Sequence, residues 1–180
     1  MLRTRGIEVI GIDPTVRLIE EASRRDPDGD YRLGLAEALP FADDAFDLVV
    51  SYLSLIDIPH LAPAIFEMAR VLAPGGTVLI ANLTSFSTAS VASGWQHGEN
   101  GERLHFAIDR YLDERAEQVR RDSIEVVNHH RPLSTYMQLL LGAGRHLTHF
   151  DEPRAIGGDQ HKAATYNRVP YAFIMTWRKS

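Results

Sequence analysis

The stretch that most limits the fold lies near the start of the chain, where a strand pattern runs directly into a helix pattern. Ile7 to Asp13 is almost continuous in apolar, β-forming residues, which is typical of a strand buried on both faces of a parallel sheet. Pro14 then lies near the start of a helix that we expect to run to about Arg25. This order predicts a βα unit whose strand ends in an acid.

The rest of the first half continues to alternate. We expect a short strand and a turn within residues 31–41, a buried strand over 46–55, a helix over 61–72 and another strand over 77–83. Apolar residues then recur at every second position from Val169 to Trp177, which predicts a closing antiparallel strand. The chain therefore predicts an α/β fold, a Rossmann-like doubly wound sheet that is mostly parallel.

The middle of the chain has a different composition. Residues 84–132 are rich in Ser, Gly and charge, with an Asn-Gly turn signal at Asn100 and a strand pattern over 123–130. We expect the charged run over 113–122 to be the solvated face of a helix. We interpret 1–180 as a single domain in which residues 84–132 are an insertion that caps the substrate side; a surface loop is the alternative.

Composition narrows the class of protein. The 180 residues are 44% hydrophobic, carry a formal net charge of -5 and include no cysteine. The charge argues against a nucleic-acid partner, and the lack of cysteine excludes a thiol nucleophile or a Cys-ligated metal. No apolar run approaches the roughly 18 residues of a membrane span, and the first residues lack a secretory pattern. We expect a cytoplasmic protein that acts away from membranes.

Three motifs follow the first strand in a fixed order. They are Ala36-Glu37 with Leu39-Pro40-Phe41, then Phe46-Asp47 with Val49, and finally Arg70-Val71-Leu72 with Pro74-Gly75-Gly76. Over residues 7–83 they resemble the class I S-adenosylmethionine-dependent methyltransferases of the small-molecule type. The C-terminal third resembles this family in architecture alone.

The resemblance implies a cofactor, a substrate class and a set of roles. Asp13 would bind the ribose hydroxyls, the turn from Leu35 to Glu37 would border the adenine, and the end of the strand at Ser51 would lie near the transferred methyl group. The implied cofactor is S-adenosylmethionine and the implied partner is a small-molecule substrate. The residues expected to bind the cofactor are Asp13, Leu35, Ala36, Glu37, Ser51 and Tyr52.

Two features depart from the family pattern. Leu35 occupies a position that is usually Asp or Asn, and the loss of that contact to the adenine amino group costs about 1–3 kcal/mol if the group is buried unpaired. The first strand and its Gly-rich loop are also missing, as in an N-terminally truncated domain. The two strands beside the missing one would pair directly, accept a strand from another chain, or remain unstable, and such open edges favour a homo-oligomer.

Methyl transfer is an in-line displacement, and a hydroxyl or amine acceptor also needs a general base. The candidate bases are His105, Tyr111, His129 and His130. On a strand, His129 and His130 would point to opposite faces, which makes them a poor chelating pair, and we expect no metal.

Two other functions remain open. A Rossmann-type NAD(P)-dependent oxidoreductase would also place an acid after a strand, but it does not explain the later motifs, and no Tyr-x-x-x-Lys site is present because Leu140 follows Tyr136. A non-catalytic remnant or interaction module of the same fold is favoured by the missing loop.

Overall fold

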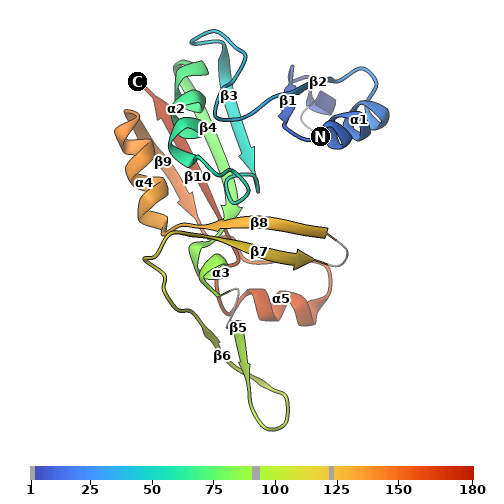
Figure 1. The fold of residues 1–180 in the computed structure, drawn as a ribbon, viewed down its shortest axis with the longest axis vertical. Coiled ribbons are helices and arrows are strands. Elements are labelled where there is room, and N and C mark those ends of the chain that lie inside the picture. The colour runs from blue at the N-terminus through green and yellow to red at the C-terminus, as the bar shows by residue number, and fades with distance from the viewer. Residues whose placement is uncertain (1–2, 91–93, 122–123) are drawn as a thin grey trace.

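A computed structural model of the protein describes residues 3–90, 94–121 and 124–180. Its helices are α1 (Val16–Arg25), α2 (Leu61–Val71), α3 (Ser85–Ala89), α4 (Leu133–Gly142) and α5 (Gln160–Tyr166). Its strands are β1 (Ile10–Asp13), β2 (Asp30–Leu33), β3 (Phe46–Tyr52), β4 (Leu72–Leu83), β5 (Gly94–His97), β6 (Arg103–Ala107), β7 (Arg115–Arg121), β8 (Ile124–His130), β9 (Arg145–Asp151) and β10 (Ala172–Lys179) (Figure 1). Within these ranges, no helix is long and apolar enough to cross a membrane.

The main sheet has the strand order β3-β4-β10-β9. Strand β3 runs parallel to β4, whereas β10 is antiparallel to both β4 and β9. Strands β1 and β2 form a separate parallel pair, with α1 between them in sequence. The prediction of a Rossmann-like α/β fold with a closing antiparallel strand is therefore confirmed.

The hydrophobic core lies on one face of the main sheet, under helices α2 and α4. The alternation predicted for β10 is confirmed, because Phe173, Met175 and Trp177 are all buried. They meet Val78 and Ile80 of β4. The helices complete the core with Leu61, Ala64, Ile65 and Met68 of α2 and with Tyr136 and Leu140 of α4.

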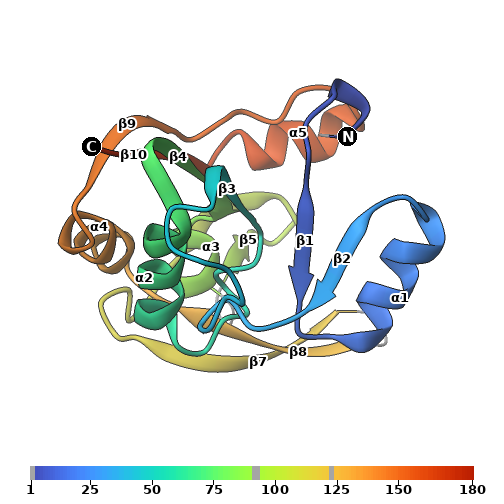
Figure 2. The same cartoon turned by 90° about the horizontal axis from the view of Figure 1, so that it is seen from above.

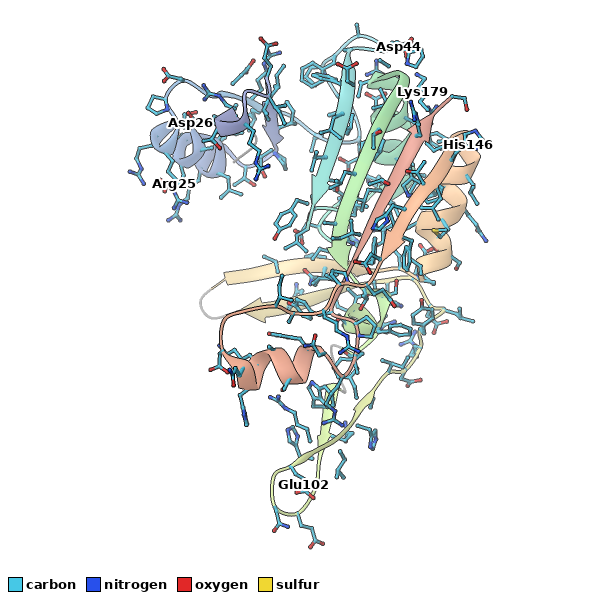
Figure 3. All side chains as sticks on the ribbon, turned by 180° about the vertical axis from the view of Figure 1, so that it is seen from behind. Arg25, Asp26, Asp44, Glu102, His146 and Lys179 are labelled. Carbon is cyan, nitrogen blue, oxygen red and sulfur yellow. The ribbon has the colours of Figure 1, made fainter. Side chains whose placement is uncertain are left out.

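The opposite face of the main sheet carries no helix among the described residues. Figure 1 shows α2 and α4 over one face, and Figure 3 shows the other face open from behind. On β3, Leu48, Val50 and Tyr52 are 39%, 43% and 72% exposed. The predicted burial of this strand is therefore correct for one face only. Parallel strands normally have both faces covered, so this apolar face is unusual.

Strands β1 and β3 do not pair with each other. They belong to different sheets, and a cavity lined by Ile10 and Ile12 on one side and by Leu48 and Val50 on the other separates them. Every residue of β1 is half-buried, although its sequence predicted burial on both faces. Direct pairing of these two strands, one of the expected outcomes, is therefore not adopted. We call this space the β1–β3 gap.

The middle segment forms two hairpins. Strands β5 and β6 pair through the predicted Asn-Gly turn, in which Gly101 has φ +79°. The helix expected over the charged run 113–122 was wrong, because β7 pairs along its length with β8; residues 122 and 123 lie outside the described part. Cross-strand pairing here overrides local helix preference, since it places Val119 opposite Val126.

The two faces of β4 provide a matched test of this architecture. We expect Ile80→Ala to lower the free energy of unfolding by about 2–5 kcal/mol, because Ile80 is fully buried in the core. Leu79→Ala, on the open face, should cost about 1 kcal/mol. Urea denaturation of both variants measures the difference. Equal losses would mean that something covers the second face in solution.

Candidate functional site

A cavity of about 650 Å³ lies at the carboxyl ends of β1, β2 and β3 and continues into the β1–β3 gap. In open α/β sheets, ligands bind at this edge of the strands. Figure 2 shows β1 and β2 directed toward the side where β7 and β8 lie. Val126 and Val127 of β8 line the cavity there. The cavity therefore has apolar walls in the gap and a polar end, which is lined by Asp13, Thr15, Glu37, Ser51, Ser54 and Asp57.

Asp13 is positioned by the junction between β1 and α1. Its Oδ1 accepts a hydrogen bond of 2.7 Å from the backbone N–H of Thr15. Its backbone carbonyl accepts one of 3.1 Å from Gly34, which ties the end of β1 to the turn after β2. The Asp13 carboxylate thus sits at the cavity with its backbone held on both sides. A carboxylate in this setting can accept hydrogen bonds from a pair of ligand hydroxyls.

The turn after β2 forms the next wall. Leu35 and Ala38 form an isolated β-bridge, with a hydrogen bond of 3.2 Å from the Ala38 N–H to the Leu35 carbonyl. Leu35, Ala36 and Glu37 all line the cavity. The wall is mostly apolar at the point where the resemblance expects an acid or amide in place of Leu35.

The end of β3 forms the opposite wall. Ser51 is buried, and its Oγ lies 2.7 Å from the Oγ of Ser54. Between them Leu53 adopts a left-handed conformation, with φ +53°, and donates its N–H to the Ala81 carbonyl over 2.7 Å. A non-glycine residue in this region is strained, and such strain is often found at functional sites.

Tyr52 does not line the cavity. Successive strand residues point to opposite faces, so Ser51 faces the core side and Tyr52 faces the open side, where it is largely exposed. Both residues were expected at the site from the sequence. Ser54 and Asp57 were not expected there, and the available signal was that they follow a strand end.

The charge of the cavity is negative. The carboxylates of Asp13, Glu37 and Asp57 line it, whereas its described lining includes no Lys, Arg or His. Opposite charges attract more strongly in a partly enclosed cavity than in water. The site therefore favours a ligand that carries positive charge.

The four predicted bases lie elsewhere, and none lines this cavity. His105 lies on the exposed β6 strand, in the β5–β6 arm that extends away from the main sheet in Figure 1. His130 is buried, with Nδ1 2.7 Å from Thr88 Oγ1 and Nε2 2.9 Å from the Tyr111 carbonyl. The Tyr111 hydroxyl accepts a hydrogen bond of 3.2 Å from Leu133 N–H. Tyr111 and His130 are thus used in packing α3, α4 and β8 together.

His129 lies on the other face of β8, as predicted. It lines a second cavity of about 530 Å³ together with His60 and Arg131. Burial lowers the pKa of His129, and the nearby charges of Arg131 and His60 lower it further. A neutral imidazole is able to accept a proton, but His129 does not line the acidic cavity, which borders the second cavity at Pro59.

Comparison with known proteins identifies the fold. Residues 1–80 match the family model described as a methyltransferase domain. A solved structure from Listeria monocytogenes, described as an S-adenosylmethionine dependent methyltransferase, is 26% identical and has a TM-score of 0.86 over 96% of this chain and 80% of its own. A second such structure, from Mesorhizobium loti, is 25% identical with a TM-score of 0.82 over 95% of this chain and 80% of its own.

Curated relatives match over shorter shares of their length. The malonyl-[acyl-carrier protein] O-methyltransferase of Erwinia billingiae is 30% identical over 77% of this chain and 51% of its own. The demethylmenaquinone methyltransferase of Renibacterium salmoninarum is 37% identical over 44% of this chain and 33% of its own. The matched part of the chain thus spans about half or less of these relatives.

The buried position of His130 predicts a loss of stability in mild acid. Burial lowers the pKa of His130 below its ordinary value of 6.5. As the pH falls through about 6.5, the unfolded chain binds a proton that the folded protein does not, so the free energy of unfolding decreases. His129 acts in the same direction. We expect His130→Gln to reduce this slope in urea titrations between pH 7.5 and 5.

Thr88→Ala is the matched control for this prediction. It removes the partner of Nδ1 but retains the imidazole. It should lower stability across the whole pH range and keep a slope close to the wild-type value. A His130→Gln variant with an unchanged slope would contradict the assignment of this effect to His130.

Proposed function

We propose that the protein transfers the methyl group of S-adenosylmethionine to a small organic substrate, in keeping with the match of residues 1–80 to the methyltransferase domain family. The solved S-adenosylmethionine-dependent methyltransferases that share its fold support this proposal. The observation that carries it is the acidic cavity at the carboxyl ends of β1, β2 and β3.

The residues of the cavity fit this cofactor. S-adenosylmethionine carries a sulfonium and an ammonium group, and three carboxylates line the cavity without a neighbouring cation in its lining. Asp13 would accept from the ribose hydroxyls, and the apolar Leu35 and Ala36 would lie against the adenine. The hydroxyls of Ser51 and Ser54 would lie near the methionine portion. A volume of about 650 Å³ is in the usual range for such ligands.

The bound cofactor supplies an electrophilic methyl group, and the residues of this chain orient it and exclude water. We propose that residues 84–132 act as a cap on the substrate side, since Val126 and Val127 of β8 form part of the cavity wall. Excluding water and aligning the two reactants account for most of what a protein can contribute to such a displacement.

A hydroxyl or amine acceptor must lose a proton when it receives the methyl group. Among the acidic residues of the cavity we propose Asp57 as the candidate base, in place of the four predicted residues, because it lines the cavity next to Ser54, whose carbonyl accepts a hydrogen bond of 2.9 Å from the Asp57 N–H. A substrate whose nucleophile is already ionised needs no base. The relatives include enzymes named for malonyl-[acyl-carrier protein] and for demethylmenaquinone, and a small organic acceptor is the class that we infer.

The β1–β3 gap is part of the proposed cofactor site, so it affects how tightly the cofactor binds. We propose that cofactor affinity is reduced here, because a strand between β1 and β3 would otherwise complete both walls and cover Leu48 and Val50. The same gap favours the alternative of a non-catalytic module. The oxidoreductase alternative has no support from the family match or from the structural neighbours.

Calorimetric titration with S-adenosylhomocysteine tests the proposal. We expect binding by the wild-type chain, and about 10- to 100-fold weaker binding by Asp13→Asn, because a hydrogen bond to a charged acceptor is replaced by a neutral one. Asn retains an oxygen that can accept from the Thr15 N–H, so the start of α1 is preserved.

Asp28→Asn, in the loop between α1 and β2, is the control and should bind like wild type. If a folded wild-type sample does not bind S-adenosylhomocysteine, the methyltransferase proposal fails for this chain and the non-catalytic module is favoured. Binding of NAD in its place would restore the oxidoreductase.

A further inference from the structure

Helix α2 carries an arginine whose hydrogen-bonding capacity is completely used. A guanidinium has five N–H donors. Nε and Nη2 of Arg70 both donate to the Glu67 carboxylate, over 2.6 Å and 2.7 Å. Nη1 donates to the Phe41 carbonyl over 2.8 Å and to the Asp43 carboxylate over 2.7 Å. Nη2 also donates to the Leu39 carbonyl over 3.1 Å. Five donors thus make five hydrogen bonds, and two of these go to the backbone of one turn.

Glu67 binds the same turn from the acceptor side. Its Oε2 accepts a hydrogen bond of 2.8 Å from the backbone N–H of Leu39. The hydrogen bonds from Arg70, followed by that from Leu39, lower the pKa of Glu67 below its ordinary value. The carboxylate therefore stays ionised, and Leu39 is bound through both its N–H and its carbonyl. We call Glu67 and Arg70 the α2 clamp.

The clamp joins parts of the protein that no strand ladder joins. Leu39 and Phe41 belong to the turn that follows the adenine-side wall, Leu35 to Glu37. Helix α2 is fixed to the main sheet through buried residues such as Ile65 and Met68. Since β1 and β3 are not hydrogen-bonded to each other, their separation is not set by a sheet register. The clamp instead ties one wall of the acidic cavity to the core that carries the other.

We propose that Arg70 and Glu67 are positioning residues that hold the Leu35–Phe41 turn at a fixed distance from the end of β3, and that they thereby set the affinity for the adenosine part of the cofactor. This inference rests on the proposed function. Neither side chain lines the cavity, so both act through the turn. Lysine cannot replace Arg70, because an ammonium has three donors and no planar fork.

The experiment compares wild type with Arg70→Lys by two measurements. Hydrogen–deuterium exchange reports on the peptide that covers residues 35–41 without cofactor, and calorimetry measures binding of S-adenosylhomocysteine and of 5′-methylthioadenosine. We expect faster exchange at the Leu39 amide and about tenfold or greater loss of affinity, by the same factor for both ligands, because the second ligand keeps only the adenosine part.

Two further variants separate positioning from general destabilisation. Lys179→Met removes the 2.5 Å ion pair with Asp44 and the hydrogen bond of 2.7 Å to the Leu72 carbonyl, which tie the same connecting segment and the start of β4 to β10 without contacting the turn at 35–41 (Figure 3). It should leave exchange at 35–41 and both affinities unchanged. Glu67→Gln retains an acceptor for Leu39 but loses the charge, and it should show an intermediate effect on both measurements while remaining folded by circular dichroism.

The outcomes are distinct. Unchanged exchange at 35–41 in Arg70→Lys overturns the clamp, whatever the cofactor result. Faster exchange with unchanged affinities shows that the turn does not govern binding, and also overturns the proposal. If wild type itself does not bind either ligand, the proposed function fails, and the exchange data alone then decide whether Arg70 holds the turn. A loss for S-adenosylhomocysteine that exceeds the loss for 5′-methylthioadenosine would place the effect at the methionine end, against the proposal.

Discussion

Packing of α2 and α4 on one face of the main sheet is the interaction on which the rest of the structure depends. It buries Phe173, Met175 and Trp177 of β10 against Val78 and Ile80 of β4. Burial of such large apolar side chains contributes about 1.5–3 kcal/mol each, so this one layer holds most of the hydrophobic stabilisation. The β1–α1–β2 unit lies outside this layer and contributes no fully buried residue to the core. Its position is therefore set by the segment that follows it, through the packing of Ala36 on the core, the contact of the Phe41 and Phe46 rings, and polar contacts.

The β1–α1–β2 unit lies outside the core layer, and this explains why polar networks concentrate along the segment that connects β2 to β3. Arg70 and Glu67 hold Leu39 and Phe41, and Lys179 holds Asp44. Exposed ion pairs alone contribute little, typically under about 1 kcal/mol. Two of the five bonds from the Arg70 guanidinium go to backbone carbonyls of the turn, and Glu67 accepts from the Leu39 N–H, so the planar guanidinium and the carboxylate together give the contact direction as well as energy. A connecting segment held in this way can serve as the wall of a binding site.

The sequence predicted the elements whose periodicity reflects burial on one face. The alternation in β10 and the buried face of α2 are examples, because both are dictated by the core that they face. The charged run that became β7 was mispredicted, since its partner β8 lies in the same segment and no local pattern announces the pairing. At the site, all the expected cofactor residues except Tyr52 line the cavity. None of the candidate bases lines the cavity, because the directions of the two hairpins, which no local pattern announces, place His105, His129 and His130 elsewhere and carry Tyr111 between them.

The gap and the binding cavity are the same space, and this has a physical consequence for function. The polar end of the cavity requires β1 and β3 to end at the same edge, since Asp13 and Ser51 both line it. In a continuous parallel sheet, hydrogen bonds between neighbouring strands enforce that alignment. Here the alignment relies on α2, because the helix is packed on the core with β4, the parallel partner of β3, and holds the turn beyond β2. An anionic cavity with one wall held in this way would become more ordered when a cation binds across it, since the ligand itself then bridges the two walls.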